Sequence, residues 1–486
     1  MRKLKPKMLI ILALITFGSL LPNIGCNTQF WDVGYDSRAT GDGNGGVIVL
    51  YDIIKSSSQR DFYAQRISAD GQALWGERGV LVGSGHKPSS FFELSIAGDS
   101  TGGAIVTLAT SAPSQPDRVD VTKLDSKGNI IWQKESISAS PIISDGNGGV
   151  FIARDYENTL TIVQVDSEGL FPWGEDGVLI KSLGTQSHYL KIERDGAGGV
   201  IAVWQEDVEL QSGTNAQKPL VEHRVLAQRI DSEGNLSWGQ DNLILYTTRE
   251  DVFIFEPRVV IDDSGEAIAV WAQIPEGQIS DKQSSRALLS DVYVQKIDTK
   301  GNILWQENGI PLGISRLEGE LVCCRLINAG SDGSGGAVIA WEEPFSVVAQ
   351  RIDANGDVKW KPRGVETLRT KSGWSVRRDM VVDRLGGATI TLKFRDDTLK
   401  KLGILLHKLD SAGDTVWQIN DIGVDVNDMG LGAESFTSYY VNDGQGGVIV
   451  FWGIGENSSS SGKSYIQRID SNGKLLWGAK GIRLDR

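Results

Sequence analysis

The architecture of this chain follows from one motif, which is seen most fully in Gln295-Lys296-Ile297-Asp298-Thr299-Lys300-Gly301-Asn302-Ile303-Leu304-Trp305. Copies of this motif recur along the whole sequence, and each copy ends in a tryptophan. The eight tryptophans are Trp75, Trp132, Trp173, Trp238, Trp305, Trp360, Trp417 and Trp477. Their separations range from 41 residues (132 to 173) to 67 residues (238 to 305), which is typical of four-stranded propeller blades with variable loops. The motif therefore predicts a single repeat architecture.

A second motif precedes each tryptophan and has the form Asp, two residues, Gly. It is seen first in Asp42-Gly43-Asn44-Gly45-Gly46, which leads into the apolar run Val47-Ile48-Val49-Leu50-Tyr51. The other copies begin at Asp99, Asp145, Asp195, Asp262, Asp332, Asp383 and Asp443. The aspartate supplies an acceptor at the turn entry, and the glycine supplies a positive φ at its exit. Both motifs thus predict tight hairpins.

Each unit is expected to hold four strands. Strand A runs into the first aspartate, strand B is the apolar run after the glycines, strand C ends in the Gln-Arg-Ile-Asp segment, and strand D carries the tryptophan. The B strands are apolar on both faces, as stacked blades require. We therefore expect an all-β chain in which residues 26–486 form a single eight-bladed β-propeller of four-stranded antiparallel blades. Strand A of blade 1 is expected near Phe30, and Gly481-Ile482-Arg483-Leu484 is expected to seal the ring.

A basic residue stands two positions before the strand C aspartate in seven of the eight copies. These residues are Arg66, Lys123, Arg229, Lys296, Arg351, Lys408 and Arg468, and Gln164 takes the place in the remaining copy. A ring of cations would suit a ligand site. In an acidic protein we expect these side chains to pair with turn carboxylates instead.

The repeat resembles the tryptophan-docking repeat of quinoprotein (PQQ-like) propellers, in which each tryptophan packs on the adjacent blade. The resemblance rests on the order Leu or Ile, Asp, two residues, Gly, three residues, Trp, and it covers all eight units. The spacing from Asp to Gly is one residue shorter than in that family, so the chain is also similar to the Asp-box of sialidase-like propellers and to uncharacterised secreted bacterial repeat proteins. The lipoprotein branch of the resemblance implies a non-enzymatic adaptor at the outer membrane, such as the propeller component of β-barrel assembly.

The dehydrogenase branch of the resemblance implies pyrroloquinoline quinone, calcium and a vicinal disulfide against the cofactor. Cys323 and Cys324 are such a vicinal pair. They lie in an apolar strand A segment, where adjacent residues point to opposite faces and a bond between them would distort the strand. We therefore expect two buried free thiols or a structural oxidised pair, and we predict no cofactor.

The first residues have the form of a secretory signal. Four basic side chains between Arg2 and Lys7 precede an apolar run from Met8 to Leu21. Gly25-Cys26 after this run resembles the lipobox of bacterial lipoproteins, with Asn23 where that family has leucine. The resemblance implies that residues 1–25 are removed and that Cys26 carries a lipid. The alternative is an ordinary secreted protein with one spare cysteine.

The net charge disfavours one class of partner. Removal of residues 1–25 leaves 45 basic and 62 acidic side chains, a net charge of −17. Such a chain repels a phosphate backbone, so nucleic-acid binding is disfavoured.

The sequence offers no constellation that commits the chain to a reaction. The four histidines, His86, His188, His223 and His407, have no metal-ligand spacing. Each Asp-x-x-Gly turn supplies one reliable carboxylate, whereas Ca²⁺ takes about six to eight oxygens. We therefore predict no catalytic residue and no metal site.

Two features mark a candidate binding face. Long polar loops between strands B and C run from Glu206 to His223, from Ile274 to Ser290 and from Glu456 to Ser464. Beside them, at the ends of B strands, the sequence places the aromatic residues Tyr51, Trp204, Trp271, Trp341 and Trp452. These aromatics either form a platform for a peptide or glycan or pack between blades.

The sequence thus predicts an exported, lipid-anchored propeller that acts as a binding or scaffold module for protein or glycan partners at the cell envelope. The expected location is the outer membrane or cell surface, and otherwise the periplasm or medium. The alternatives are a propeller enzyme, either a PQQ-type dehydrogenase or a glycan-cleaving hydrolase, and a passive surface protein.

Overall fold

The computed structural model is all β. It describes residues 38–55, 59–86, 94–110, 118–136, 142–156, 159–181, 186–211, 220–250, 252–275, 289–316, 326–343, 346–368, 374–396, 401–420, 422, 433–456 and 463–485. These ranges contain no helix that is long and apolar enough to cross a membrane. The strands form eight separate four-stranded sheets, and in each sheet the strands follow sequence order. All neighbouring strands are antiparallel, so the predicted fold class is confirmed.

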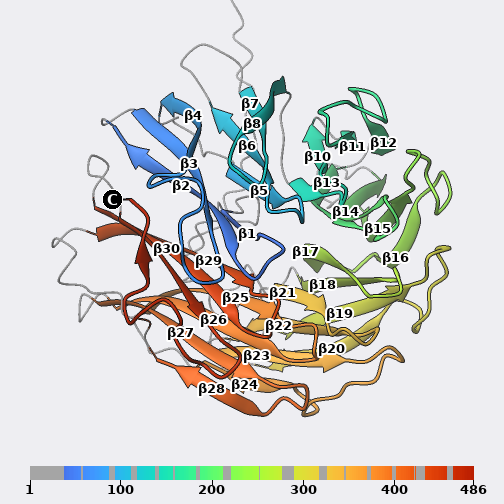
Figure 1. Cartoon of the computed structure of the whole chain (residues 1–486). Helices are drawn as coiled ribbons and strands as arrows, with labels where there is room; N and C mark the ends of the chain where they lie inside the picture. Colours follow the sequence, from blue (N-terminus) through green and yellow to red (C-terminus); the bar gives the residue numbers. More distant parts are fainter. Residues whose placement is uncertain are drawn as a thin grey trace, which may run out of the picture.

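Each blade places its strands from the centre of the ring outward in the order A, B, C, D (Figure 1). The A strands are β1 (Ala39–Gly41), β5 (Leu94–Gly98), β9 (Ile142–Ser144), β13 (Gln186–Arg194), β17 (Val252–Ile261), β21 (Leu326–Ser331), β25 (Trp374–Val382) and β29 (Ala433–Asn442). The B strands are β2 (Val47–Ile54), β6 (Ala104–Thr110), β10 (Val150–Tyr156), β14 (Val200–Gln211), β18 (Ala267–Pro275), β22 (Ala337–Glu343), β26 (Ala388–Asp396) and β30 (Val448–Glu456).

The outer half of each blade is formed by the C and D strands. The C strands are β3 (Gln59–Ile67), β7 (Arg118–Leu124), β11 (Thr159–Val165), β15 (Leu220–Ile230), β19 (Leu289–Ile297), β23 (Ser346–Ile352), β27 (Lys401–Leu409) and β31 (Lys463–Ile469). The D strands are β4 (Val80–His86), β8 (Ile130–Ser136), β12 (Val178–Lys181), β16 (Leu243–Thr248), β20 (Ile310–Arg316), β24 (Val365–Thr367), β28 (Thr415–Ile419) and β32 (Ile482–Arg483).

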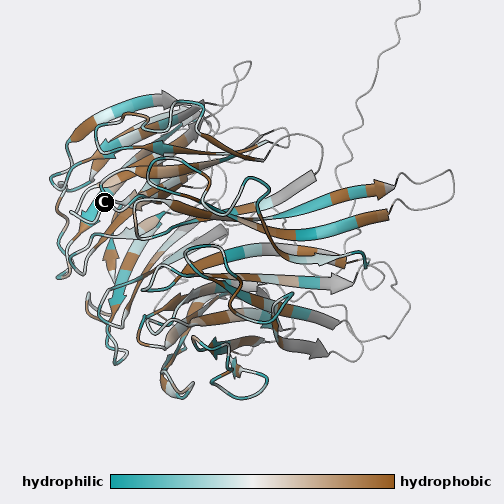
Figure 2. Cartoon of the chain, turned by 90° about the vertical axis from the view of Figure 1, so that its right-hand side faces the viewer, coloured by the Kyte–Doolittle hydropathy of each residue, from teal (hydrophilic) through white to brown (hydrophobic). Residues whose placement is uncertain are grey.

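The core consists of eight apolar clusters, one between each pair of neighbouring blades. Side chains alternate along a strand, so one B strand supplies two clusters. In β2, Ile48 and Leu50 pack toward blade 2, whereas Val47 and Val49 pack toward blade 8. Figure 2 shows these apolar segments along the strands and the hydrophilic residues at the turns. Burial on both faces explains why the B strands do not alternate in polarity.

The ring closes without a shared strand. Innermost strands of successive blades contact one another all the way round, and β29 of blade 8 contacts β1 of blade 1. Blades 8 and 1 also share a cluster that includes Tyr51 and Trp477. The predicted sequence-contiguous blades are therefore confirmed. Residues 481–484 take part in this closure: Ile482 and Arg483 form β32, the D strand of blade 8, and Ile482 and Leu484 pack in the cluster shared by blades 8 and 1.

The prediction that strand D carries the tryptophan holds only for Trp132 in β8 and Trp417 in β28. In the other six blades the chain leaves the sheet at the tryptophan and re-enters it about five residues later. A residue with positive φ stands directly before each of those D strands: Gly79, Gly177, Asn242, Gly309, Gly364 and Gly481. A Cβ on Gly79 would lie 2.2 Å from the Ala64 carbonyl oxygen, so this return requires a glycine. In blades 2 and 7 the tryptophans stay in strand D.

Candidate ligand site at the mouth of the central channel

The side chains that recur in every repeat make the hydrogen bonds that hold the turns in place. In the A–B turn of blade 1, Asp42 Oδ1 accepts hydrogen bonds from the amides of Asn44 and Gly46, each at 2.8 Å. In the C–D turn of blade 2, Asp125 Oδ1 accepts from the amides of Lys127 and Asn129 at the same distance. These carboxylates satisfy turn amides that would otherwise lack partners.

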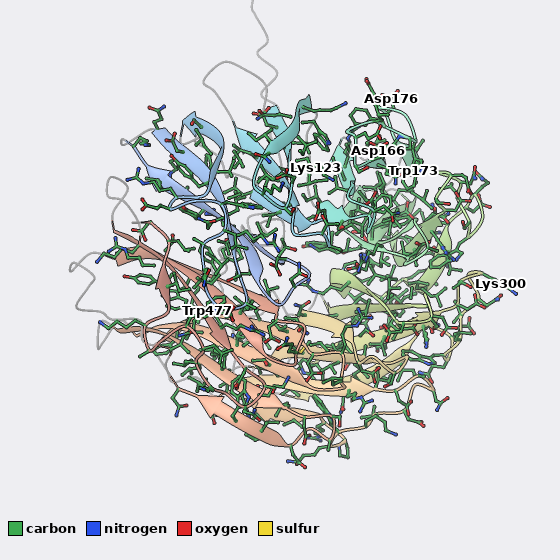
Figure 3. The ribbon with its side chains drawn as sticks, viewed as in Figure 1. Lys123, Asp166, Trp173, Asp176, Lys300 and Trp477 are labelled. Atoms are coloured by element: carbon green, nitrogen blue, oxygen red, sulfur yellow. The ribbon has the colours of Figure 1, made fainter. Side chains whose placement is uncertain are left out.

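The eight motif tryptophans dock on the next blade. Each indole Nε1 donates to the carbonyl of the residue that follows the strand C aspartate, or Ser68 in blade 1, with distances between 2.9 Å for Trp417 and 3.3 Å for Trp238. The turn glycine beside that carbonyl leaves room for the ring: a Cβ on Gly128 would lie 2.8 Å from Trp75. Figure 3 labels Trp173 and Trp477, which belong to this set. The docking is thus structural.

The lysine and arginine residues of the C strands also stabilise the fold. Arg66 Nε donates to Asp42 Oδ2 at 3.0 Å, and Lys408 Nζ lies 2.6 Å from Asp383 Oδ2. The same pairing with the A–B turn aspartate of the same blade recurs for Arg229, Lys296, Arg351 and Arg468. Lys123, labelled in Figure 3, donates to the Gly148 carbonyl of the next blade. Six of the seven cations therefore pair with turn carboxylates, as predicted, whereas Lys123 bonds a backbone carbonyl.

The aromatic residues at the ends of the B strands do not form a surface. Tyr51, Trp204, Trp271, Trp341 and Trp452 are between 0 and 3% exposed and belong to inter-blade clusters. The Tyr51 hydroxyl donates to the Arg78 carbonyl at 2.5 Å, and Trp452 stacks on Tyr465. The ligand platform is corrected accordingly: these rings pack between blades, because the neighbouring blade covers each of them.

Several predictions fall outside the described residues. Cys26, Cys323, Cys324 and the segments 212–219, 276–288 and 457–462 of the B–C loops belong to this group. The lipid anchor, the state of the thiols and a role of these loops stay predictions. Among the described residues, no group of three or more His, Cys, Asp or Glu side chains lies together as a metal site requires.

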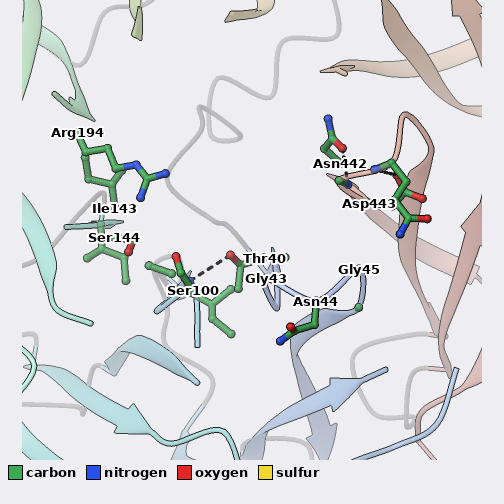
Figure 4. Close-up of a pocket in the computed structure, with 18 of the residues that line it drawn as sticks. Thr40, Gly43, Asn44, Gly45, Ser100, Ile143, Ser144, Arg194, Asn442 and Asp443 are labelled. Atoms are coloured by element: carbon green, nitrogen blue, oxygen red, sulfur yellow. Dashed lines mark hydrogen bonds between the residues drawn. The ribbon is translucent and has the colours of Figure 1, made fainter. Parts of the chain in front are cut away.

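A cavity of about 690 Å³ opens on the face that carries the A–B turns, near the centre of the ring, and we call it the channel mouth (Figure 4). It is lined by the ends of A strands and by A–B turns from blades 8, 1, 2, 3 and 4. Its polar walls are formed by Thr40, Asn44, Ser100, Ser144, Asn442 and Gln445. A volume of this size is ordinary for a small ligand or for one group of a larger partner.

The carboxylates at this mouth are already engaged. Asp42 accepts two turn amides and Arg66, and Asp443 accepts the amides of Gln445 and Gly447 together with Arg468 at 3.0 Å. Their negative charge is therefore balanced from within the blades. Apart from the Glu193 carboxyl, the mouth presents hydroxyl, amide and backbone groups.

Arg194 is the basic side chain of the cavity wall. It is exposed and makes no ion pair with a described residue. Figure 4 shows its guanidinium directed into the cavity, and Gly146 of blade 3 leaves room for it, since a Cβ there would lie 3.1 Å from Nη1. Glu193 accepts a hydrogen bond from the Arg194 amide at 3.2 Å, and burial raises the pKa of this carboxyl. The wall thus carries a positive group in an acidic protein.

Sequence reasoning missed this site, although a signal was present. The residue before the A–B turn aspartate is Gly41, Gly98, Ser144, Arg194, Ile261, Ser331, Val382 or Asn442 in the eight copies. Arg194 is the one charged residue in this column, and the fold brings the column to the channel mouth. The long B–C loops and the aromatic residues at the ends of the B strands indicate the opposite face instead.

The sequence matches no protein-family profile, and no curated protein matches it significantly. Similar solved structures include an ulvan lyase of polysaccharide lyase family PL25, with 11% identity and a TM-score of 0.46, over 78% of this chain and 94% of that chain. The propeller domain of the Trilobed protease from Pyrococcus furiosus has 11% identity and a TM-score of 0.36, over 80% of this chain and 99% of that chain. Prolyl oligopeptidase B from Galerina marginata has 11% identity and a TM-score of 0.35, over 90% of this chain and 50% of that chain. The eight-bladed architecture therefore rests on the blades themselves, and membership of the quinoprotein-type family stays a prediction.

Proposed function

We propose that this chain is an exported binding or scaffold module, held at the cell envelope by a lipid on Cys26, whose partner inserts an acidic group into the channel mouth. The partner is a protein or glycan of the outer membrane, the cell surface or the periplasm. The observation that carries the proposal is the cavity of about 690 Å³ with hydroxyl and amide groups in its walls and the Arg194 guanidinium directed into it.

The chemistry of the wall supports an acidic ligand. Charge-assisted hydrogen bonds from a guanidinium to a carboxylate or sulfate are among the strong ones, and a planar fork fits either group. Thr40, Ser100 and Ser144 add hydroxyl groups that suit a polyol or a peptide backbone. The enzyme alternative is not favoured, because the turn carboxylates Asp42 and Asp443 hold amides and arginines of their own blades.

The test compares Arg194→Ala with Arg384→Ala. Arg384 is an exposed arginine of the same face that lies outside the cavity wall and is paired with Asp263. Partners retained by the purified chain from solubilised envelope are quantified for each variant. A lost charge-assisted bond is worth about 1.5 to 3 kcal/mol, so Arg194→Ala should lower retention at least about tenfold and Arg384→Ala should not. Equal retention of partners by both variants would show that the channel mouth is not the binding site.

A further inference from the structure

A polar seam lies between blades 4 and 5, at the B–C ends of their strands and away from the channel mouth. We call it the 4/5 seam. On blade 4 the seam side chains lie on the same face of the sheet as Val203 and Val225, which packs against blade 5. On blade 5 they lie on the same face as Trp271, which packs against blade 4. The seam residues are Gln205, Asp207, His223, Tyr246 and Thr248 on blade 4, and Trp271, Gln273, Asp291 and Tyr293 on blade 5.

The aromatic rings of the seam form one group. The ring centroids of Tyr246 and Trp271 lie 5.7 Å apart, those of Tyr246 and Tyr293 5.9 Å, and those of Trp271 and Tyr293 5.8 Å. Trp271 is fully buried, whereas both tyrosines are partly exposed. The group therefore reaches the surface through its tyrosines.

The seam holds more acceptors than donors. Gln205 Oε1, Gln273 Oε1 and Asp291 Oδ1 are buried atoms that accept no hydrogen bond from the described residues, and Trp271 Nε1 is the one buried seam donor left unused there. Buried polar atoms normally have partners, so three open acceptors in one place point to a missing donor. A ligand that donates hydrogen bonds satisfies this imbalance.

Asp291 also lacks a counter-charge. Its described contact is the Tyr293 hydroxyl, 3.4 Å from Oδ2, and burial raises the pKa of the Asp291 carboxyl. His223 is held by Asp207 at 2.7 Å. Two arginines at the same end of blade 4, Arg224 and Arg249, are paired with Glu222. No basic side chain of the described seam therefore neutralises Asp291.

Blade 1 shows how the fold satisfies the same position. Asp61 and Asp291 both stand six residues before the last residue of strand C, and each precedes a tyrosine by two residues. Asp61 accepts from the Ser84 hydroxyl at 2.7 Å and lies 3.2 Å from Lys55 Nζ. The Ser84 hydrogen bond holds the pKa of Asp61 below its usual value. Blade 1 thus pairs this carboxylate, whereas blade 5 leaves it open.

We propose that the 4/5 seam binds the ammonium group of a ligand, with Asp291 as its counter-ion and the rings of Tyr246 and Tyr293 beside it. An ammonium group supplies three donors and one positive charge, which answers the open acceptors and the unpaired carboxylate together. Aromatic faces attract cations within about 6 Å of a ring centroid. The negative net charge of −13 favours the approach of cations from solution. Entry requires rotation of Gln273 and Tyr293, which are partly exposed.

Among cations, the seam suits an ammonium group better than calcium. Calcium takes about six to eight oxygen ligands, often from several carboxylates. The open oxygens here are two amide oxygens and one carboxylate oxygen, bordered by rings. This inference does not depend on the channel mouth, which is lined by the opposite ends of the strands.

The probe is n-butylammonium chloride, and the readouts are the thermal midpoint and calorimetric titration. The wild-type chain and the matched control Asp61→Asn should show a saturable rise of the midpoint, and Asp291→Asn should bind at least tenfold more weakly. Tyr293→Phe keeps the ring and should retain binding, whereas Tyr293→Leu should weaken it. Neutral n-butanol should have no such effect.

The thermal midpoint without ligand is a second readout. Loss of a carboxylate that stabilises the fold would lower this midpoint, whereas loss of a carboxylate reserved for a ligand would not. Asp291→Asn removes a carboxylate without a counter-charge and should leave the midpoint unchanged or raised, whereas Asp61→Asn should lower it. The proposal is overturned if Asp291→Asn retains ammonium binding, if it lowers the midpoint as Asp61→Asn does, if n-butanol acts as well as n-butylammonium, or if only calcium chloride stabilises the chain.

Discussion

Trp477 closes the ring, and its replacement by alanine gives a quantitative prediction. The indole is 7% exposed, belongs to the cluster between blades 8 and 1, and donates to the Ala69 carbonyl at 3.1 Å. Arg468 Nη1 donates to the same carbonyl at 3.2 Å, so that acceptor keeps a partner in the variant. The loss is therefore mainly one of packing, and removal of a buried tryptophan costs about 3 to 5 kcal/mol.

The matched control is Trp360→Ala. Trp360 is 5% exposed, donates to the Ser411 carbonyl at 3.0 Å and shares that acceptor with Arg351. Urea unfolding should give both variants a similar loss of about 3 to 5 kcal/mol. Small-angle scattering should show a larger radius of gyration for Trp477→Ala only, because blades 6 and 7 are joined by the chain and blades 8 and 1 are not. A loss below about 1 kcal/mol for Trp477→Ala would refute this account of closure.

Three further predictions follow from the same contacts. Gly128→Ala should lower the free energy of unfolding by about 2 kcal/mol or more, since its Cβ would lie 2.8 Å from Trp75 and its φ is positive; unfolding in urea checks this. Arg468→Met should cost about 3 kcal/mol because it strips the partner from buried Asp443, whereas Arg384→Met at an exposed pair should cost under about 1 kcal/mol. The Asn129 side chain holds the pKa of the Asp125 carboxyl below its usual 3.8, so the stability it contributes is present above pH 3.8 and is lost as pH falls through the folded value. Unfolding midpoints measured from pH 5 down to pH 2 should therefore decline, and Asp125→Asn should flatten that decline.

The fold was predictable because different residues of the repeat specify the turns and the core. Aspartate and glycine at fixed offsets specify both hairpins, and an apolar B strand specifies burial on two faces. The sequence misplaces strand D because a tryptophan at the end of an apolar run resembles a strand residue. The residue four positions after it, such as Gly79 or Gly309, carries the information that the chain leaves and re-enters the sheet.

The candidate site was less predictable, because it depends on neighbours from other blades. The aromatic residues Trp204 and Trp271 fit an exposed platform by sequence, and only the adjacent blade shows that they are covered. Arg194 is the one charged residue among its eight equivalents. The sequence alone does not show that residues of blades 8, 1, 2 and 3 complete a cavity beside it. Asp291 and Asp61 are alike in sequence, but Ser84 and Lys55 contact Asp61 alone.

The most direct test of the central claim is photo-cross-linking of the exported chain in the envelope of cells that produce it. A photoreactive residue is placed at Asn44 or Gln445 on the channel mouth, or at Glu209 or Leu220 at the B–C end of blade 4, all of which are exposed. The account predicts partner adducts from Asn44 and Gln445 that disappear in the Arg194→Ala background. Adducts formed only from Glu209 or Leu220, or adducts at the mouth that are indifferent to Arg194→Ala, would contradict it.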